Sequence, residues 1–284
     1  MTHPRVPHLS TIAELRRQVR AWRKSGSQVG LIPTMGALHA GHIELVAQAK
    51  ARADRVVTSI FVNPAQFAPH EDFDRYPRTL DSDLQLLAPA GCDLVWAPTV
   101  SEMYPSGFAT RIVPAGAAEG LESDVRPHFF GGVATVCCKL FTQVAPDFAV
   151  FGEKDYQQLC VMKQLVRDLD LPLEIVGAAT IREPDGLAMS SRNRYLSAGE
   201  RAIAPALNRA IVGVGQAIGR GVSIADACAN ASAAIVAAGF AKVDYVAVRE
   251  ADTLAPVGYG NAVAKRVLAA AWLGKTRLID NVAA

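Results

Sequence analysis

Short apolar segments alternate with segments of helical length over the first 180 residues of this chain, and this alternation limits the folds available to it. The strand candidates are rich in β-branched and aromatic residues: Val29–Ile32, Val56–Val62, Asp93–Trp96, Phe148–Phe151 and Leu173–Val176. The helical candidates are Gly41–Ala53, Ser82–Leu87, Val133–Val144 and Tyr156–Asp168. Strands separated by helices form βαβ units and a parallel sheet. Their continuous apolar character indicates that both faces of the sheet are covered.

The pattern changes near Arg182. A loop leads into Ala-rich helical segments, and two more strand candidates follow; these elements are Asp185–Asn193, Ala198–Ile218, Ile224–Ala238, Val243–Val248 and Arg266–Leu273. Alanine is a strong helix former, so the Ala-rich segments indicate helices and not disorder. We therefore predict an α/β protein with a Rossmann-like, doubly wound parallel sheet over residues 1–181 and a smaller α+β domain over residues 182–284.

Charge and cysteine content argue against several classes of protein. The formal net charge is +2 and the basic residues are dispersed, whereas nucleic-acid-binding surfaces cluster Lys and Arg. The five cysteines form no CxxC pair and are odd in number, so we expect reduced thiols. Charged residues interrupt every apolar stretch, and the N-terminus lacks the profile of a signal peptide. We expect a cytoplasmic protein that binds neither nucleic acid nor membrane.

One loop lies where a parallel sheet binds ligands. Residues Ile32–His42 read IPTMGALHAGH, between a predicted strand and a predicted helix. Open α/β sheets bind ligands beyond the carboxyl ends of their strands, and the first N–H groups of a helix attract phosphate. Gly36 and Gly41 permit close backbone approach, and His39 and His42 are spaced to stabilise charge on one phosphate cluster. Taken alone, this spacing also fits an ordinary exposed loop or half of a metal site.

Three further polar clusters lie at the ends of strands. Asn63 and Gln66, in FVNPAQF, carry amides that donate and accept hydrogen bonds, which suits a substrate with hydroxyl and carboxylate groups. The segment Gly152–Asp155 contains a lysine that could meet a phosphate, and Gln158 follows one turn later. Two hydroxyls and an arginine in Met189–Arg192 could clamp a triphosphate. Each cluster could be a cap or a turn, but together they favour an ATP-dependent enzyme acting on a small carboxylic acid.

These motifs together resemble the pantoate–β-alanine ligase family, within the nucleotidyltransferase superfamily that carries HIGH and KMSKS-like motifs. PTMGxLHxGH, FVNPxQF and FGEKD form a specific set, and the resemblance covers essentially the whole chain, including Tyr76–Leu80, Asp185–Ala188 and Thr276–Asn281. The resemblance implies an ATP-dependent condensation of (R)-pantoate with β-alanine that releases AMP and pyrophosphate. The pantoate carboxylate would attack the α-phosphorus to give pantoyl adenylate, and the β-alanine amine would then attack the activated carbonyl.

The resemblance also implies roles for individual residues. The catalytic residues would be His42, as proton donor, with His39 and Lys154 at the phosphates. Pantoate would contact Gln66, Gln158 and Asn63, and β-alanine would contact Gln66. The implied ATP site comprises Met35, Gly36, Ala37, Leu38, His39, Ala40, Gly41, His42, Gly152, Glu153, Lys154, Asp155, Ile181, Met189, Ser190, Ser191 and Arg192.

The resemblance implies ATP as a substrate, Mg²⁺ as its companion ion, and a homodimer. Mg²⁺ usually bridges phosphate oxygens and takes few protein ligands. Asp83 is a candidate for one of these ligands or for the ion's water shell. It lies in the segment Asp81-Ser82-Asp83, where Ser82 stands at a position that is acidic in the family. A loop rich in Gly and Ser between the domains would allow the second domain to close over ATP.

One segment departs from the family's pattern. The family shows R-P-x-H-F-x-G-V before the long helix, whereas residues 126–133 of this chain read RPHFFGGV. Phe129 therefore occupies the histidine position, and His128 lies one residue earlier. A shift of the backbone could restore the imidazole, or the position could simply help to pack the pantoate pocket. A missing contact would weaken pantoate binding and spare adenylation.

Two other functions stay open on the sequence. A nucleotidyltransferase that acts on a phosphate would need more basic residues near its acceptor than the amides of Asn63, Gln66 and Gln158. A catalytically silent nucleotide-binding homologue would keep the fold without its chemistry. The intact histidine pair, Lys154 and the two serines argue against that second possibility.

Overall fold

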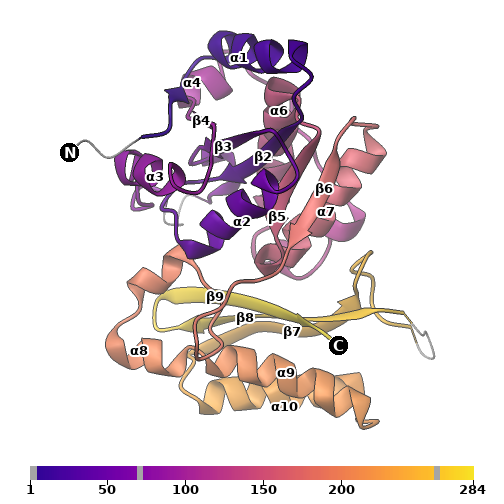
Figure 1. The fold of residues 1–284 in the computed structure, drawn as a ribbon. Coiled ribbons are helices and arrows are strands. Elements are labelled where there is room, and N and C mark those ends of the chain that lie inside the picture. Colours follow the sequence, from indigo (N-terminus) through magenta and orange to yellow (C-terminus); the bar gives the residue numbers. More distant parts are fainter. Residues whose placement is uncertain (1–4, 69–72, 259–262) are drawn as a thin grey trace.

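The chain forms two units, each built around its own sheet. The computed structural model describes residues 5–68, 73–258 and 263–284. Within these ranges a six-stranded sheet lies in the N-terminal unit and a three-stranded sheet in the C-terminal unit (Figure 1). The predicted α/β class, with a smaller α+β part, is confirmed. The described residues include no helix long and apolar enough to cross a membrane.

The larger sheet is parallel throughout. Its strands follow the order β1-β4-β3-β2-β5-β6, with the bounds β1 His8–Leu9, β2 Val29–Thr34, β3 Arg55–Ile60, β4 Leu94–Trp96, β5 Phe148–Gly152 and β6 Glu174–Ala178. The chain runs outward from β2 through β3 to β4 and then returns to pair β5 with β2. Strand order therefore reverses between β2 and β5, where doubly wound sheets bind their ligands.

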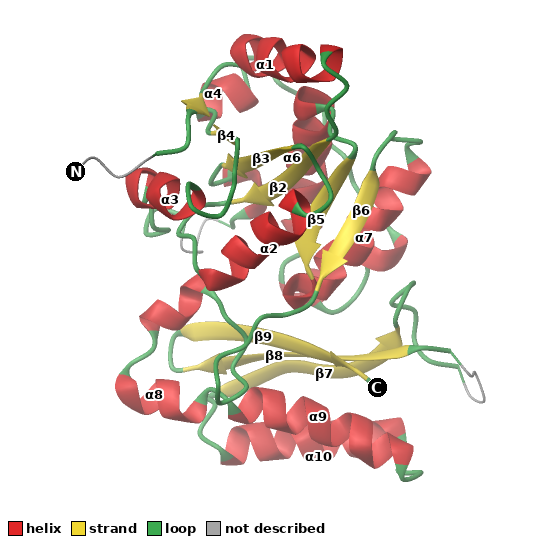
Figure 2. Ribbon diagram, viewed as in Figure 1, coloured by secondary structure: helices red, strands yellow, loops and turns green. Residues whose placement is uncertain are grey.

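Helices cover both faces of this sheet (Figure 2). Side chains alternate between the faces along a strand, so Leu31 lies in one apolar core and Ile32 in the other. The first core includes residues of α1 (Ile12–Lys24), α6 (Phe129–Val144) and α7 (Tyr156–Asp168). The second includes residues of α2 (Ala40–Lys50) and α3 (Leu80–Leu87). Each fully buried aliphatic side chain contributes about 1.5–3 kcal/mol to this packing.

Gly132 allows α6 to lie in close contact with the backbone of a short turn. α6 begins four residues before the predicted Val133, so Gly132 lies inside its first turns. A Cβ at Gly132 would lie 2.3 Å from the carbonyl oxygen of Ala65, in the 3-10 turn η1 (Pro64–Gln66). Only glycine allows this approach of α6 to η1. The remaining short elements of the N-terminal unit are α4 Val100–Met103, α5 Glu122–Val125, η2 Gly116–Ala118 and η3 Glu153–Asp155.

The C-terminal unit is an antiparallel sheet backed by two long helices. The order is β7-β8-β9, with the elements η4 Ser191–Tyr195, α8 Ala198–Ile203, α9 Ala206–Gly219, α10 Ile224–Ala237, β7 Lys242–Glu250, β8 Lys265–Leu273 and β9 Thr276–Ala283. α9 and α10 cover one face of this sheet, and its other face lies toward the N-terminal unit (Figure 1). On β8, Val267 packs into the C-terminal core while Leu268 packs into a core of the N-terminal unit.

Besides short elements such as β1, α4 and α5, the structure differs from the prediction in three longer elements. The helical segment predicted over Ala198–Ile218 is two helices, because Pro205 cannot donate a backbone hydrogen bond inside a continuous helix. α1 was not predicted; only Leu15 and Val19 of this helix are buried. β9 was not predicted either, because polar residues occupy several of its buried positions. The expected boundary between residues 181 and 182 falls in the connection between β6 and η4.

Candidate active site

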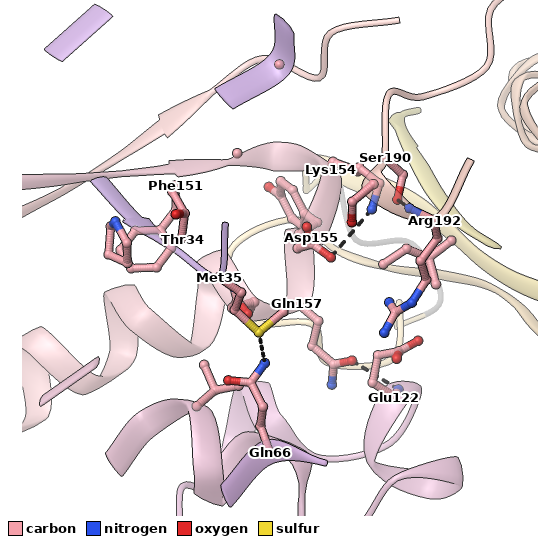
Figure 3. Close-up of a pocket in the computed structure, with 18 of the residues that line it drawn as sticks. Thr34, Met35, Gln66, Glu122, Phe151, Lys154, Asp155, Gln157, Ser190 and Arg192 are labelled. Carbon is pink, nitrogen blue, oxygen red and sulfur yellow. Dashed lines mark hydrogen bonds and ion pairs between the residues drawn. The ribbon is translucent and has the colours of Figure 1, made fainter. Parts of the chain in front are cut away.

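A cavity opens where β2 and β5 end, between the two units of the chain. Thr34 and Met35 reach it from the end of β2, Phe151 from β5, and Tyr245 and Arg277 from the second sheet. Figure 3 shows Thr34, Met35 and Phe151 around this space, together with labelled side chains from other segments, such as Gln66 and Ser190. The position is the strand-order switch point, so the predicted loop and the cavity coincide.

The two histidines cap the helix that begins at this cavity. His39 is the N-cap of α2, and its Nδ1 accepts a hydrogen bond from the Gly41 N–H at 3.2 Å. The Nδ1 of His42 accepts from the His39 N–H at 3.4 Å, which completes a reciprocal capping box. Because both Nδ1 atoms accept, each neutral imidazole carries its proton on Nε2. The three-residue spacing therefore fixes the tautomer of both rings.

Burial keeps these two imidazoles neutral. It lowers the pKa of His39 to about 4, and the nearby positive charges of Lys154 and Arg194 contribute to the same shift. Burial also lowers the pKa of His42 to about 3, with smaller contributions from His39 and Lys154. The ring centroids of the pair are 4.1 Å apart. At neutral pH the site therefore offers two uncharged N–H donors beside a lysine charge.

Asp83 anchors the turn that precedes the histidines. Gly36 and Ala37 have left-handed φ values of 82° and 52°, and such a turn needs external support when a non-glycine residue takes part. The Asp83 carboxylate accepts hydrogen bonds from the Ala37 and Leu38 N–H groups at 3.0 and 2.9 Å, and from the Thr79 hydroxyl at 3.0 Å. Asp83 is only 1% exposed and does not line the cavity. This geometry favours an anchor for the loop over the metal ligand expected from the sequence.

Most of the predicted ATP residues come together around the cavity. Those that line it are Met35, His39, Gly41, His42, Gly152, Lys154, Asp155, Ile181, Met189, Ser190, Ser191 and Arg192. Those that do not are Gly36, Ala37, Leu38, Ala40 and Glu153. Ala37 and Leu38 are buried in the loop beneath the cavity, where their N–H groups bind Asp83. The Glu153 carboxylate instead pairs with Arg266 at 3.0 Å.

Asn63 and Gln66, whose amides were predicted to contact pantoate, are hydrogen-bonded to each other but differ in the capacity they keep for a ligand. Asn63 is 1% exposed, and its Nδ2 donates to the Gln66 Oε1 and the Gly132 carbonyl, both at 3.1 Å. Its Oδ1 accepts from the Tyr104 hydroxyl at 2.8 Å and from the Ala65 N–H at 3.2 Å. Both ends of the Asn63 amide are thus engaged, so this residue orients Gln66.

Gln66 keeps hydrogen-bonding capacity for a ligand. Its Nε2 donates to the Met35 Sδ at 3.2 Å, which is a weak acceptor, and a second N–H stays available. Gln158 also lines the cavity, and no hydrogen bond of its side chain occurs within the part of the chain that the structure describes. Its neighbour Gln157 is buried and holds the turn before α5, accepting from the Glu122 N–H at 3.1 Å.

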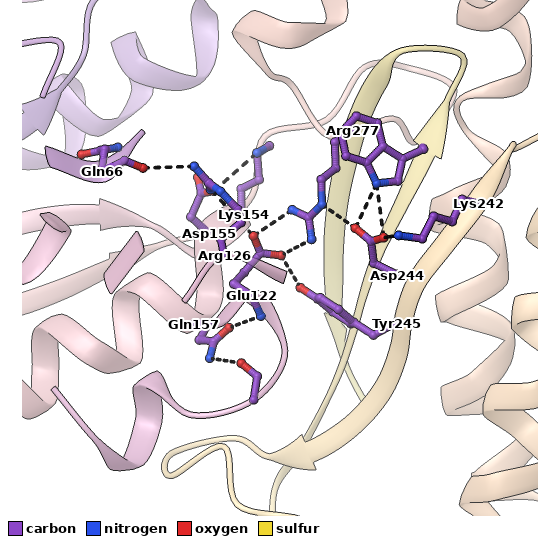
Figure 4. Close-up of polar contacts among 12 residues, drawn as sticks. Gln66, Glu122, Arg126, Lys154, Asp155, Gln157, Lys242, Asp244, Tyr245 and Arg277 are labelled. Atoms are coloured by element: carbon purple, nitrogen blue, oxygen red, sulfur yellow. Dashed lines mark hydrogen bonds and ion pairs between the residues drawn. The ribbon is translucent and has the colours of Figure 1, made fainter. Parts of the chain in front are cut away.

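An ion-pair network between the two units forms one wall of the cavity (Figure 4). Glu122 of α5 is 6% exposed and pairs through both oxygens with the Arg277 guanidinium of β9, at 2.8 Å each. The Tyr245 hydroxyl donates to Glu122 at 2.7 Å, and the Arg277 Nε donates to Asp244 at 2.7 Å. The paired carboxylates raise the pKa of Arg277. The sequence predictions missed these residues; Arg277 lies in the quoted segment Thr276–Asn281, which offered a signal.

At the segment that departs from the family's pattern, the backbone places Phe129, and not His128, at the cavity. Phe129 lines the cavity, whereas His128 is an exposed N-cap of α6 that lies outside the cavity lining. The Arg126 guanidinium carbon lies 3.9 Å from the centroid of the Phe129 ring. An arginine over an aromatic face is a favourable contact. The imidazole is therefore not restored by a shift, and a stacked Arg126–Phe129 pair occupies this part of the wall.

Fold and site together define a class of enzyme. At the end of β2 in a parallel sheet, a capped helix presents two neutral imidazoles beside a lysine, two serines and an arginine. The same cavity is also lined by the amides of Asn63, Gln66 and Gln158. This arrangement is typical of α/β enzymes that bind a nucleotide at a helix N-terminus and a small polar substrate beside it. A model of one such family, Pantoate-beta-alanine ligase, matches residues 8–283, and the chain belongs to that family.

Curated relatives agree with this assignment along their full length. Pantothenate synthetase from Mesorhizobium japonicum is 58% identical over 282 residues, which cover 99% of this chain and 98% of that protein. Pantothenate synthetase from Caulobacter vibrioides is 55% identical over 285 residues, covering 100% and 99%. These relatives favour a ligase over a phosphate-accepting nucleotidyltransferase.

Solved structures share the fold. Pantothenate synthetase from Thermus thermophilus superposes with a TM-score of 0.90 at 47% identity, covering 98% of this chain and 99% of that one. Pantoate-beta-alanine ligase from Francisella tularensis, complexed with beta-gamma ATP and beta-alanine, gives 0.82 at 34% identity, covering 98% and 97%. The two-unit architecture is therefore common to this chain and to relatives that carry the ligase name.

Proposed function

We propose that this chain condenses (R)-pantoate with β-alanine at the expense of ATP, through pantoyl adenylate, to make pantothenate, a precursor of coenzyme A. Family membership supports the overall reaction. The residue roles below rest on the arrangement of the cavity. The observation that carries them is the reciprocal His39–His42 cap, because it leaves the Nε2–H of two neutral imidazoles as donors in residues that line a cavity shared with Lys154.

In the first step, a pantoate carboxylate oxygen forms a bond to the α-phosphorus, and the bond to the β-phosphate bridging oxygen breaks. Negative charge grows on the departing pyrophosphate. The Nε2–H groups of His39 and His42, the α2 N-terminus and the Lys154 ammonium stabilise that charge without reorganising. Ser190, Ser191 and Arg192, which line the same cavity, hold the triphosphate as well, and the backbone at Ile181 meets the nucleotide. Catalysis at this step is positioning and charge stabilisation.

In the second step, the β-alanine nitrogen forms a bond to the pantoyl carbonyl carbon. The carbon–oxygen bond to AMP then breaks, and the amine loses a proton. Gln66 contacts both substrates and Gln158 contacts pantoate, while Asn63 fixes the orientation of Gln66. An acyl adenylate reacts readily with water, so the paired wall of Glu122 and Arg277 protects it until the amine arrives.

We infer that Mg²⁺ enters as MgATP and is held chiefly by phosphate oxygens and water. Asp155 lines the cavity and keeps an accessible carboxylate, with its Oδ1 3.7 Å from the Lys154 Nζ. It is better placed than buried Asp83 to contact the ion's water shell. An Asp155→Asn variant should raise the Mg²⁺ concentration needed for half-maximal activity.

We also propose a homodimer and a cytoplasmic location. The dimer rests on the family resemblance, and sedimentation equilibrium of the purified protein tests it. The location is supported by the five free cysteines, of which Cys92, Cys137 and Cys160 are buried thiols that need no oxidising compartment. Cell fractionation with an antibody to the protein tests this second proposal.

An omission assay tests the proposed reaction. ATP, Mg²⁺, pantoate and β-alanine are supplied together and then with one component left out, and AMP, pyrophosphate and pantothenate are measured. We expect pyrophosphate release to require pantoate, and pantothenate to require both acids. Pyrophosphate release independent of pantoate would overturn the proposal. His42→Ala should lower kcat by about a hundredfold or more, since it removes one preorganised donor, and near-normal kcat would refute its role.

A further inference from the structure

A buried asparagine on the last strand of the second unit forms hydrogen bonds to the backbone of the first unit at Glu153 and Lys154. Asn281, on β9, is 2% exposed. Its Nδ2 donates to the carbonyl oxygen of Glu153 at 2.8 Å and to that of Lys154 at 2.9 Å. Both hydrogens of the amide are used on consecutive carbonyls of a loop more than a hundred residues away in the sequence.

The two carbonyls belong to the peptide groups on either side of the Lys154 Cα. Peptide groups are planar, so fixing both planes fixes the φ and ψ of the residue between them. The direction of the Lys154 Cα–Cβ bond is thereby set from the second unit. The lysine charge acts on both His39 and His42, whose pKa values it lowers. A change in the direction of the Lys154 side chain would therefore change the electrostatic environment of both histidines.

The Asn281 amide is itself held in one orientation. Its Oδ1 accepts a hydrogen bond from the Arg266 Nε at 2.7 Å. Arg266 is in turn fixed by the Glu153 carboxylate at 3.0 Å and by the Tyr156 ring, whose centroid is 4.0 Å from the guanidinium carbon. Flipping the amide would turn an oxygen toward two carbonyl oxygens and a nitrogen toward a cation. Asparagine is therefore required here, because aspartate cannot donate to either carbonyl.

We propose that Asn281 is a positioning residue for Lys154, which makes phosphate binding in the first unit depend on the docked second sheet. This inference rests on the proposed function, since it assigns Lys154 to the ATP phosphates. Asn281 acts on the nucleotide through the lysine. Loss of Asn281 should therefore weaken ATP binding more than pantoate binding, and the effect should vanish once Lys154 is absent.

The experiment measures the Kd of a non-hydrolysable ATP analogue, and the KM values of ATP and pantoate, in Asn281→Asp and Asn281→Ser. We expect the analogue Kd to rise at least about tenfold, the equivalent of losing one buried hydrogen-bonded support. The pantoate KM should change less than about twofold. In a Lys154→Ala background, either Asn281 substitution should leave the Kd within about twofold of Lys154→Ala alone.

Asn208→Ser is the matched control. The Asn208 Nδ2 donates to Asp280 at 3.0 Å, inside the second unit and not across to the first, and Asn208 does not line the cavity. We expect its analogue Kd to stay near that of the wild type. Should Asn281→Asp fail to fold, Arg266→Lys supplies the test, because it keeps a charge near Glu153 while removing the Nε donor to Asn281. That variant should give a smaller rise in Kd with the same dependence on Lys154.

Different outcomes separate the two proposals. If the wild type makes pantothenate and Asn281→Asp binds the analogue normally, the positioning role is overturned. The same holds if the effects of Asn281→Asp and Lys154→Ala on the Kd are additive. If the wild type releases no pyrophosphate with pantoate, the proposed function itself fails.

Discussion

Burial holds His42 and His39 in the neutral form at neutral pH, and their protonation has a defined effect on stability. Their pKa values are lowered from 6.5 to about 3 and about 4 in the folded protein. Between pH 6.5 and 4 the unfolded chain therefore binds protons that the native protein does not. By linkage, the free energy of unfolding falls as the pH drops through this window. A group with a raised pKa would give the opposite sign.

We predict that His39→Gln/His42→Gln loses less stability than the wild type between pH 6.5 and 4.5. Each imidazole removed should flatten the pH dependence of the unfolding free energy by up to about 1.4 kcal/mol per pH unit. Urea unfolding at several pH values measures this dependence. The exposed His128 offers a control, and His128→Gln should follow the wild type. Equal slopes in all three proteins would show that the buried rings titrate as they do in the unfolded chain.

The sequence was sufficient to single out the two histidines, but it did not reveal the hydrogen bonds that they make. The H-x-x-H spacing after a strand singled out two residues that line the cavity, but the phosphate-site prediction also needed the three further polar clusters. That the spacing is also a reciprocal helix cap depends on backbone N–H directions that no residue pattern records. Asn63 shows the same limit. Its residue type suited a substrate contact, but neighbours from Tyr104 to Gly132 engage both ends of its amide.

Among the elements, α3 anchors the loop at Ala37 and Leu38 through Asp83, and this contact carries a clear prediction. Asp83→Asn removes one carboxylate oxygen that accepts from the Ala37 or Leu38 N–H. We expect the ATP KM to rise about tenfold or more, and stability to fall by about 1–3 kcal/mol, because a buried donor loses its acceptor. The Mg²⁺ concentration for half-maximal activity should stay unchanged at saturating ATP. A specific loss of Mg²⁺ activation would instead identify Asp83 as a metal ligand.

The same helix provides the control. Asp81 lies in the first turn of α3, is exposed, and pairs with Arg5 at 3.1 Å on the surface. Exposed ion pairs contribute about 0–1 kcal/mol, so Asp81→Asn should leave both stability and ATP KM near the wild-type values. Equal behaviour of the two variants would contradict the anchoring role.

Elements with a simple hydrophobic pattern were predictable, and those that carry polar function were less so. β2 and β5 are largely continuous apolar runs, as expected for strands whose two faces are both covered by helices. β9 escaped prediction because its buried positions include Asp280 and Asn281, which serve contacts with other segments. A strand whose inward side chains are polar has no period-two apolar pattern to detect.

On the scale of the whole molecule, the two units are joined by buried charges at the cavity. Glu122 comes from one unit, and Arg277 and Tyr245 come from the other. Carboxylate and guanidinium groups cost free energy to desolvate, and removing one partner of such a buried pair costs about 3–5 kcal/mol. The pair therefore fixes the relative position of the units strongly once formed. Glu122, Tyr245 and Arg277 line the same cavity as Gln66 and Gln158, so the pair forms part of the cavity wall.

We predict that Glu122→Gln uncouples ATP consumption from product formation. Without the carboxylate, the Arg277 wall no longer closes in one position, water reaches the adenylate, and AMP appears without pantothenate. The measurement is the ratio of AMP to pantothenate at low β-alanine, which should be near one in the wild type and rise severalfold in Glu122→Gln. Tyr245→Phe, which removes one donor to the same carboxylate, should give a smaller rise.

Glu174→Gln makes the same chemical change at an exposed pair with Arg52, on the N-terminal unit, and should leave the ratio at the wild-type value. The ratio of AMP to pantothenate also distinguishes protection of the intermediate by Glu122 from simple substrate binding by that residue. If Glu122 only contacted a substrate, Glu122→Gln would raise a KM while every AMP released still accompanied one pantothenate. A ratio that stays near one in Glu122→Gln at every β-alanine concentration, low concentrations included, would therefore show that the two units do not protect the intermediate through this pair. A ratio that rises and returns toward one at saturating β-alanine is the behaviour expected of a leaking intermediate, since amine and water then compete for the same carbonyl.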